Sequence, residues 1–177
     1  MSDPSRADDS GPVPGSRHYL SALALDADSI KRGNPNIEHE REVAIYDILE
    51  ANHFEVVGRD DGPYSLRLGV ADDKLVLSVT PKPAADSAGA DGETAVIAIA
   101  MLPLRRVVKD YFLVCETYFD AIRTAPPTRI QQIDVGRRAL HDEGATALIE
   151  RLAGRVTLDQ TTARRLFTLV CALHWRG

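Results

Sequence analysis

The clearest periodic pattern along the chain is an alternation of apolar and polar residues in two neighbouring segments. Every second residue is apolar over 64–70 and again over 75–79, which is the period of a strand with one buried face. The turn-forming residues 71–74, ADDK, separate the two segments, so the pattern predicts a β-hairpin. A third apolar run, residues 94–101, is expected to pair with the hairpin and complete an antiparallel meander.

Two short apolar runs and one helical pattern precede this hairpin. Residues 20–25 and 54–57 are predicted to be short strands. Between them, apolar residues recur at helical spacing from Ile37 to about Ala51, which predicts an amphipathic helix. We expect Asn36 to cap that helix, because an asparagine side chain accepts a hydrogen bond from an otherwise free backbone amide.

The pattern changes to a helical period after residue 102. Pro103 suits the first turn of a long helix, and Pro126-Pro127 is expected to end it. The apolar stripe of this predicted helix consists of Leu104, Val108, Tyr111, Cys115, Tyr118 and Ile122.

Further helices are predicted after the proline pair. Thr128 and Thr157 each have a glutamine three residues later, which matches the capping box at a helix start. We expect the first of these helices to break at Gly144 and the segment to end at Gly154. The last helix, 159 to about 174, is apolar around most of its circumference, which predicts a place at the centre of the core.

The order of elements, strands first and helices later, indicates the α+β class. We expect a single domain over residues 18–177, in which an antiparallel β-meander packs against the C-terminal helices. Residues 1–17 are rich in Ser, Asp, Pro and Gly and are predicted to be a disordered tail, and residues 81–93 are predicted to be a flexible loop. A chain of 177 residues buries roughly two-thirds of its unfolded surface, so it needs neither disulfide nor metal to fold.

The composition argues against several classes of protein. With 44% hydrophobic and 27% charged residues, the chain is neither wholly disordered nor collagen-like. The longest uncharged apolar stretch, 166–173, is far shorter than the ~20 residues of a membrane span. The acidic N-terminal segment contains no apolar region typical of a secretory signal, and two cysteines exclude a disulfide scaffold. We therefore expect a soluble, cytoplasmic protein with no membrane contact.

No sequence motif indicates a cofactor or a metal ion, and neither is expected. The phosphate loop, the dinucleotide fingerprint, the paired CxxC motif and the nucleophile elbow are absent from the sequence. His39 lies among three glutamates, but no second histidine follows four residues later, as zinc on one helix would require. Cys171 and His174 are three residues apart, yet the predicted burial of their helix favours a packing role for Cys171.

The net charge of −5 is unevenly distributed along the chain. Residues 1–102 carry 9 basic and 18 acidic side chains, whereas residues 103–177 carry 12 basic and 8 acidic ones. All 12 basic residues except Lys109 are arginine, which binds phosphate and carboxylate groups in a bidentate manner. The asymmetry indicates either a surface for an acidic partner or arginines that pair only with the acidic half of the chain.

The start of the long predicted helix is the first candidate binding site. Arg105, Arg106 and Lys109 lie within its first two turns, where the helix dipole disfavours cations. A helix N-terminus with arginines suits an anion such as phosphate. Alternatively, Arg106 pairs with Asp110 four residues later and Arg105 is solvated.

The second candidate is the densest polar cluster, which consists of Arg137, Arg138, His141, Asp142 and Glu143. His141 is a possible general base that a neighbouring carboxylate orients. Adjacent residues on a helix point in different directions, however, so His141, Asp142 and Glu143 cannot converge on one atom. Asp134–Arg138 and Arg138–Asp142 have the spacing of ordinary ion pairs, which favours a solvated, paired face.

Several segments together resemble a known bacterial family. They are IEHEREVAIYDILE, GPYSLRL, LPLRRVVKDYFLVCETYFDAIRTA, IDVGRRALHDEGATALIERLAG and RRLFTLVCALHWRG. These segments are similar to uncharacterised protein family 0262, a small group found mainly in alphaproteobacteria, and the resemblance extends over residues 19–177. The chain differs in its long start and in the extended 81–93 loop. The resemblance implies a bacterial cytoplasmic protein, carries over no catalytic residue and leaves the function open.

The sequence leaves the biochemical activity unknown and supports three hypotheses. The leading one is a non-catalytic binding or regulatory module whose arginine-rich helices bind an acidic partner, which is a protein, a nucleic acid or a phosphorylated metabolite. Its candidate binding residues are Arg105, Arg106, Lys109, Arg137, Arg138 and His141. The alternative is a small hydrolase that uses His141 with Asp142 or Glu143, or His39 with its glutamates. The third is a homodimer in which the apolar final helix completes the interface.

Overall fold

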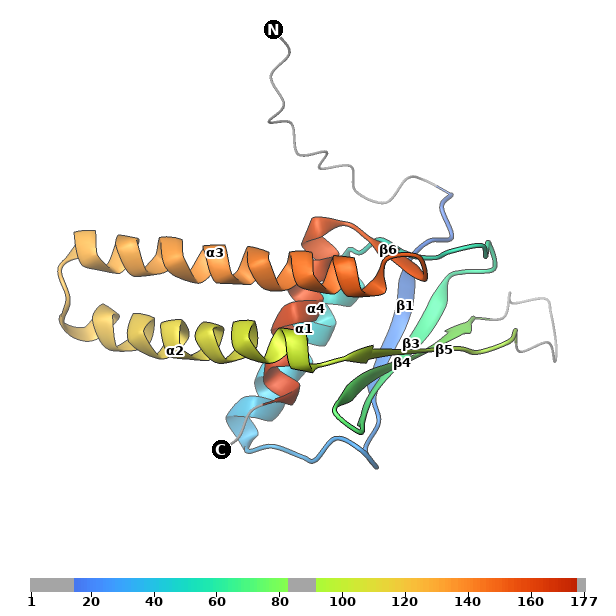
Figure 1. Cartoon of the computed structure of the whole chain (residues 1–177), viewed down its shortest axis with the longest axis horizontal. Coiled ribbons are helices and arrows are strands. Elements are labelled where there is room, and N and C mark those ends of the chain that lie inside the picture. The colour runs from blue at the N-terminus through green and yellow to red at the C-terminus, as the bar shows by residue number, and fades with distance from the viewer. Residues whose placement is uncertain (1–14, 83–91, 175–177) are drawn as a thin grey trace, which may run out of the picture.

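Within residues 15–82 and 92–174, which the computed structural model describes, the chain forms two sheets and four helices (Figure 1). In chain order the elements are β1 (Leu20–Leu25), α1 (Pro35–Glu50), β2 (Phe54–Val56), β3 (Tyr64–Ala71), β4 (Lys74–Pro81), β5 (Ala95–Ala100), α2 (Leu102–Thr124), α3 (Pro127–Leu152), β6 (Val156–Leu158) and α4 (Gln160–Leu173).

The larger sheet has the strand order β1-β3-β4-β5. Its last three strands are antiparallel neighbours, which confirms the predicted meander. β1, however, pairs with β3 in the parallel direction, so the sheet is mixed. The alternation of apolar residues predicts which face of a strand is buried but carries no information on the direction of the neighbouring strand.

A second, smaller sheet joins two distant parts of the chain. β2 and β6 pair in the antiparallel direction, with Phe54 opposite Leu158 and Val56 opposite Val156. The sequence predicts β2 but not β6, because the spacing of Thr157 and Gln160 matches a capping box and assigns this segment to a helix start. The pairing ties the connection between α3 and α4 to the N-terminal half of the domain.

The turn between β3 and β4 lies within the predicted residues 71–74 and is tighter than that segment. Ala71 pairs with Lys74, so only Asp72 and Asp73 connect the strands. Both aspartates have left-handed backbones, with φ of 50° and 59°. Aspartate tolerates this conformation, and two such residues match the right-handed twist of the strands they join.

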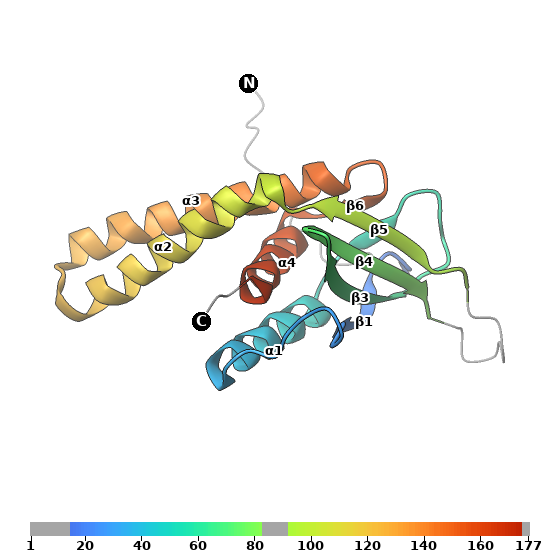
Figure 2. The same cartoon turned by 60° about the horizontal axis from the view of Figure 1, so that its bottom comes forward.

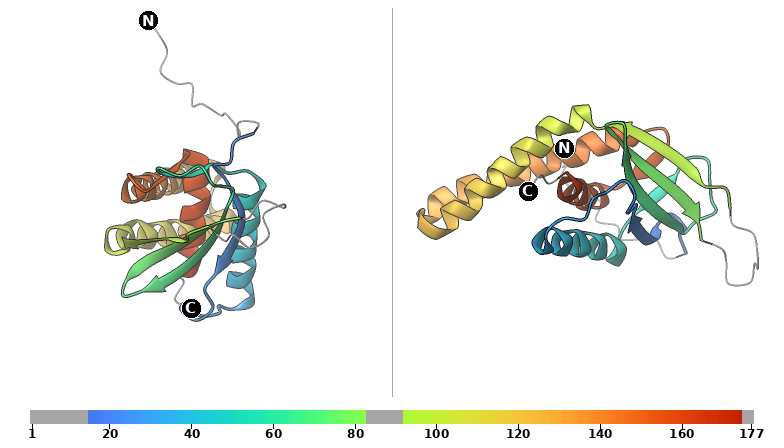
Figure 3. Two further views of the ribbon diagram at one scale, coloured as in Figure 1. Left: turned by 90° about the vertical axis from the view of Figure 1, so that its right-hand side faces the viewer. Right: turned by 90° about the horizontal axis from the view of Figure 1, so that it is seen from below.

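The four helices divide into a packed body and an arm. α4 lies between α1 on one side and the antiparallel pair α2 and α3 on the other (Figures 2 and 3). Its residues Leu166, Phe167 and Val170 are buried, which confirms the predicted central place of the last helix. The far ends of α2 and α3 extend past α1 and α4 as an arm (Figure 1).

The apolar stripe of α2 therefore leaves the core before the helix ends. Leu104 and Val108 are buried, whereas Tyr111 and Cys115 are half-buried. Ile122, near the end of the arm, is exposed. The helical period predicts a common face for these residues, but it does not show that only the first half of the face meets the body of the domain.

Three predicted helix caps are wrong. Asn34, rather than Asn36, caps α1, and Pro35 then occupies the first turn, where its missing amide costs nothing. Thr128 lies inside α3, and Thr157 lies in β6, where it precedes the true cap of α4, Asp159. A threonine with a glutamine three residues later also occurs inside helices and strands, so the spacing alone does not fix a helix start.

The predicted break at Gly144 is also wrong, because α3 continues through it. Gly144 is buried against the ring of Phe167, and a Cβ atom there would collide with that ring. The glycine therefore allows α3 and α4 to approach closely. The predicted end of the segment is confirmed, since α3 stops at Leu152 and Gly154 has a left-handed φ of 85°.

The described residues form a single compact α+β domain, which confirms the predicted fold class. Residues 1–14, which make up most of the predicted tail, lie outside the described part, and so do residues 83–91 of the predicted loop. In the part of the chain that is described, no helix is both long enough and apolar enough to cross a membrane.

Candidate functional site

A groove with a volume of about 840 Å³ lies between α1 and α2, and α4 forms its floor. α1 and α2 stand on opposite sides of α4 in the fold (Figure 3). The side chain of Arg137, from α3, also lines the groove. Because all four helices contribute, we call it the four-helix groove.

The α1 wall of the groove is one face of that helix. Asn36, Glu40, Val43 and Asp47 follow one another at steps of four, three and four residues, so they lie in a row. His39 lies beside Glu40 at the same wall. Val43 is 44% exposed, so an apolar side chain in this wall faces solvent.

The α2 wall is the half-buried part of the apolar stripe. Tyr111, Cys115 and Tyr118 line the groove together with Glu116 and Phe119. Phe119 is 64% exposed. The predicted apolar stripe of α2 thus lies in the core at the start of the helix and forms a wall of the groove further along the helix.

The floor consists of small side chains. Thr168, Cys171 and Ala172 of α4 lie at the bottom of the groove at steps of three and one. Cys171 and Ala172 are buried and Thr168 is half-buried. Small residues on this face let another group approach the backbone of α4 closely.

Aromatic rings connect the α2 wall to α3 and α4. The ring of Tyr111 stacks on His141 with centroids 5.5 Å apart and meets Phe167 edge-on at 5.6 Å. Burial raises the pKa of Tyr111, and burial likewise raises the pKa of the Cys115 thiol that hydrogen-bonds to it. Both groups are therefore neutral near pH 7, and neither is an activated nucleophile.

His141 is held by polar groups of α4. Its Nε2 lies 2.9 Å from the carbonyl oxygen of Arg164 and 2.8 Å from Oγ1 of Thr168. A carbonyl only accepts hydrogen bonds, so Nε2 carries the proton of the neutral ring. Burial lowers the pKa of His141. The imidazole is thus a packed, neutral side chain beside the groove.

The two carboxylates next to His141 in the sequence serve other partners. Asp142 pairs with Nε of Arg164 at 3.1 Å, and Glu143 pairs with Nη2 of Arg106 at 2.5 Å. Neither contact involves the imidazole. The pair that the sequence spacing suggests between Arg138 and Asp142 is replaced by the contact of Asp142 with α4.

Cys171, for which the sequence favours a packing role over a nucleophilic one, has no base to activate it among the interactions of the described residues. Burial raises the pKa of Cys171, and the ring of His174 uses Nδ1 to contact the carbonyl oxygen of Val170 at 2.8 Å. Within the described residues, no group of three His, Cys, Asp or Glu side chains is placed to hold a metal ion.

Arg137 and Arg138 both use the carboxylate of Asp134. Nη2 of Arg137 lies 2.7 Å from Asp134, and Nε of Arg138 lies 3.0 Å from it, as the sequence spacing predicts. The guanidinium of Arg137 also lies over the ring of Tyr118, 5.0 Å from its centroid. Arg137 is thus ion-paired and fixed in the groove, while Arg138 is exposed.

The basic start of α2 lies away from the groove and is largely paired. Arg105 forms an ion pair with Asp73 in the β3–β4 turn. Arg106 pairs with Asp110 at 3.3 Å, as expected from the spacing, and reaches Glu143 of α3. Lys109 is exposed. The Arg106–Glu143 contact brings the two predicted clusters side by side near the start of α2.

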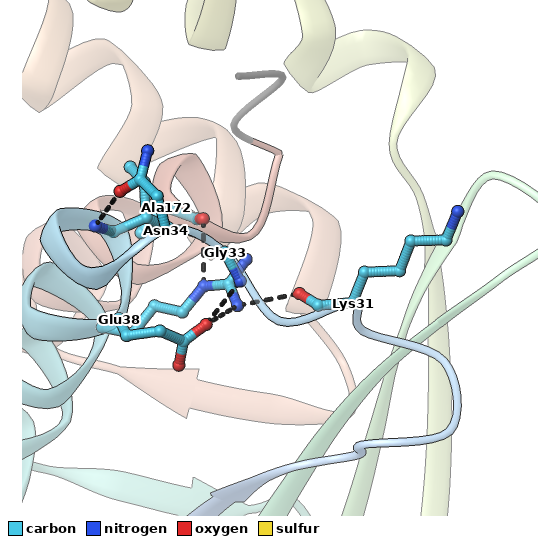
Figure 4. A network of polar contacts seen from close by, with 7 residues as sticks. Lys31, Gly33, Asn34, Glu38 and Ala172 are labelled. Carbon is cyan, nitrogen blue, oxygen red and sulfur yellow. Dashed lines mark hydrogen bonds and ion pairs between the residues drawn. The ribbon is translucent and has the colours of Figure 1, made fainter.

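A buried arginine fixes the α1 wall to the floor (Figure 4). Arg41 is 5% exposed and donates from Nε to the carbonyl oxygen of Ala172. Its Nη1 donates to the carbonyl oxygen of Lys31 and to Glu38, which in turn accepts from the amide of Gly33. The network therefore sets the position of α1 relative to α4, and with it the width of the groove.

The structure brings only part of the predicted site residues to the groove. Arg137 lines it and His141 packs behind Tyr111, whereas the basic start of α2 lies elsewhere. The α1 wall is absent from the predicted binding residues. One sequence signal does indicate the α1 wall. Val43 and Tyr46 are apolar or aromatic residues outside the face that α1 buries against the core, and both are exposed.

The chain is similar to a family of bacterial proteins over nearly its whole length. The model of the uncharacterised protein family UPF0262 matches residues 17–176. The UPF0262 protein of Azorhizobium caulinodans is 52% identical over 161 residues, which is 89% of this chain and 94% of the relative. A UPF0262 protein of Rhodopseudomonas palustris strain BisB18 is 47% identical over 163 residues, 92% of this chain and 95% of the relative. No solved structure matches the chain.

Proposed function

The chain belongs to the uncharacterised protein family UPF0262, and we propose that it is a non-catalytic binding protein whose four-helix groove holds an apolar segment of a partner protein. The observation that carries this proposal is the groove itself: side chains of all four helices line about 840 Å³, and Val43 and Phe119 expose apolar surface at its walls. Concave, largely apolar sites with a few polar groups are the usual form of a binding site.

The hydrolase hypothesis finds less support. Its base, His141, is neutral and bonded to α4, and the carboxylates of Asp142 and Glu143 pair with arginines. His39 is at the groove wall, but a lone exposed histidine next to a glutamate is no catalytic pair.

The hypothesis of an acidic partner on an arginine-rich surface also finds less support. α2 and α3 together carry eight basic and seven acidic residues, so this pair of helices is close to neutral. Four arginines of the predicted set already contact carboxylates within the molecule. This surface, the possible homodimer and the cytoplasmic location stay predictions.

The proposal is tested by affinity capture with the tagged full chain and two variants. Val43→Arg places a charged chain in the α1 wall, and Val135→Arg makes the same change at an exposed valine of α3 outside the groove. We expect a protein from the lysate of the source bacterium that is retained by the wild type and by Val135→Arg but lost from Val43→Arg.

Amide hydrogen exchange of the purified complex then locates the contact. Protection confined to residues 36–47 and 111–119 supports the groove as the binding site. Equal retention by Val43→Arg, or protection only on the outer face of the arm, overturns it.

A further inference from the structure

We propose that the segment held in the four-helix groove is a cationic amphipathic helix of about three turns. This inference rests on the proposed function and adds the chemistry of the partner. Three features of the groove support it: the arrangement of its helices, its length and its charge.

The arrangement of the walls leaves room for one more helix. α1 and α2 stand on either side of α4, and each of the three presents one row of side chains to the groove. Helices pack at interaxial distances of about 8–10 Å, by placing the ridge of one helix between the ridges of others. The small floor residues Cys171 and Ala172 allow an approach of this kind.

The length of the walls fits a short helix. The row on α1 extends from Asn36 to Asp47, and eleven steps of a helix cover about 16 Å. The row on α2, from Tyr111 to Phe119, covers about 12 Å. A partner helix of three turns has the same length, and its apolar side chains at helical spacing would meet Val43, Cys115 and Phe119.

The negative charge of the groove walls favours a positively charged partner. Glu40 and Asp47 lie on the α1 wall and Glu116 lies on the α2 wall. No described cation forms an ion pair with these three carboxylates. The arginine of the groove, Arg137, is already ion-paired with Asp134.

The surroundings of the α1 wall strengthen this charge. α1 contains five acidic residues and one basic residue, Arg41, which is buried and paired with Glu38. The negative charge of Glu40 reaches across the groove, since it helps to raise the pKa of Cys115, after burial as the main cause. Lysines or arginines beside the apolar face of a partner helix would meet this field from both walls.

Two synthetic peptides of about three to four turns test the proposal. Both carry the same leucines at helical spacing, with lysines at the polar positions of one and glutamates at those of the other. Binding to the full chain is measured by fluorescence anisotropy of a peptide label at low and high salt. We expect the lysine peptide to bind about tenfold or more tightly than the glutamate peptide, with the preference reduced by salt.

Matched variants place the interaction. The double variant Glu40→Lys with Glu116→Lys is expected to weaken the lysine peptide about tenfold and to strengthen the glutamate peptide. Glu42→Lys, which changes the same kind of charge on α1 outside the groove, is expected to leave the order of the peptides unchanged. A proline in the middle of the lysine peptide is expected to abolish binding, because it breaks the helix.

The outcomes separate the two proposals. If the two peptides bind the wild type equally well and Val43→Arg abolishes the binding of both, the groove is a binding site and the cationic partner is wrong. If the proline peptide binds as well as its parent, the helical form is wrong. If neither peptide binds, or if Val43→Arg changes nothing while the peptides bind, the proposed function fails as well.

Discussion

The side chain of Arg41 reaches from the middle of α1 to the last turn of α4, where its Nε donates to the carbonyl oxygen of Ala172 at 3.2 Å. The last carbonyl groups of a helix have no hydrogen-bond partner within that helix. A cation at this end also interacts favourably with the helix dipole. One side chain therefore completes the end of α4 and holds the α1 wall of the groove against it.

Replacing Arg41 with methionine is expected to destabilise the fold by about 2–4 kcal/mol. The change leaves the carbonyl oxygens of Ala172 and Lys31 and the carboxylate of Glu38 without their donor. Chemical denaturation of both proteins measures the loss. Arg67→Met, at an exposed position of β3, is the control and is expected to stay within about 0.5 kcal/mol of the wild type.

Two glycines of α3 are expected to respond in opposite ways to alanine. Gly144→Ala pushes a Cβ into the ring of Phe167 and is expected to cost about 1–3 kcal/mol. Gly136→Ala meets nothing within 4 Å and is expected to stabilise the helix by up to about 1 kcal/mol. Thermal unfolding of the two variants checks the contrast. Equal effects of both changes would mean that α3 and α4 do not touch at Gly144.

His141 is expected to make the fold less stable in mild acid. Burial lowers its pKa in the folded state below the ordinary 6.5, so below about pH 6.5 the unfolded chain binds more protons than the folded chain. The contribution of neutral His141 to the free energy of unfolding is therefore complete above pH 6.5. It declines as the pH falls from 6.5 toward the pKa of His141 in the folded state. His141→Gln keeps polar atoms but cannot titrate in this range, so its stability is expected to depend less on pH there. Denaturation at a series of pH values compares the slopes, and identical slopes contradict the prediction.

The two thiols are expected to differ in reactivity. Cys115 is half-buried at the groove wall, whereas Cys171 is 3% exposed, and burial raises the pKa of each. A thiol reagent such as a disulfide dye should modify Cys115 slowly in the native protein and Cys171 at least about tenfold more slowly. Cys115→Ser is expected to remove the faster reaction and Cys171→Ser to leave it. Fast modification of both thiols in the folded protein would contradict the central place of α4.

The predicted acidic-partner surface has its own test. Arg105→Glu with Arg106→Glu reverses the basic start of α2 and breaks the contacts with Asp73 and Glu143. Because these ion pairs are exposed, the stability is expected to change by no more than about 1 kcal/mol per pair. Capture of partners by the double variant from lysate is then compared with the wild type. If every interaction survives the reversal, the surface is the wrong one.

Local pattern predicted the elements of this fold with the exception of β6. The β3–β4 hairpin follows from alternation on either side of residues 71–74, and the apolar circumference of α4 places that helix in the core. The caps were less predictable, because Asn34 and Asn36, or Thr157 and Asp159, compete at neighbouring positions and only the path of the chain decides between them.

In the candidate site, the sequence identified single residues but not which of them contact one another. The charges of Arg105, Arg106, Arg137 and Arg138 are visible in the sequence, while their partners are not. Glu143, for example, looks like a neighbour of His141 but pairs with Arg106 on another helix.

By itself the sequence determined the α+β class, the antiparallel meander and the amphipathic and buried helices, because each depends on the spacing of residues within one segment. The tertiary structure alone decided the parallel pairing of β1 with β3, the β2–β6 sheet and the four-helix groove. Residues 36–47 and 111–119 are far apart in the sequence and face each other only because α4 packs against α1 on one side and against the α2–α3 pair on the other.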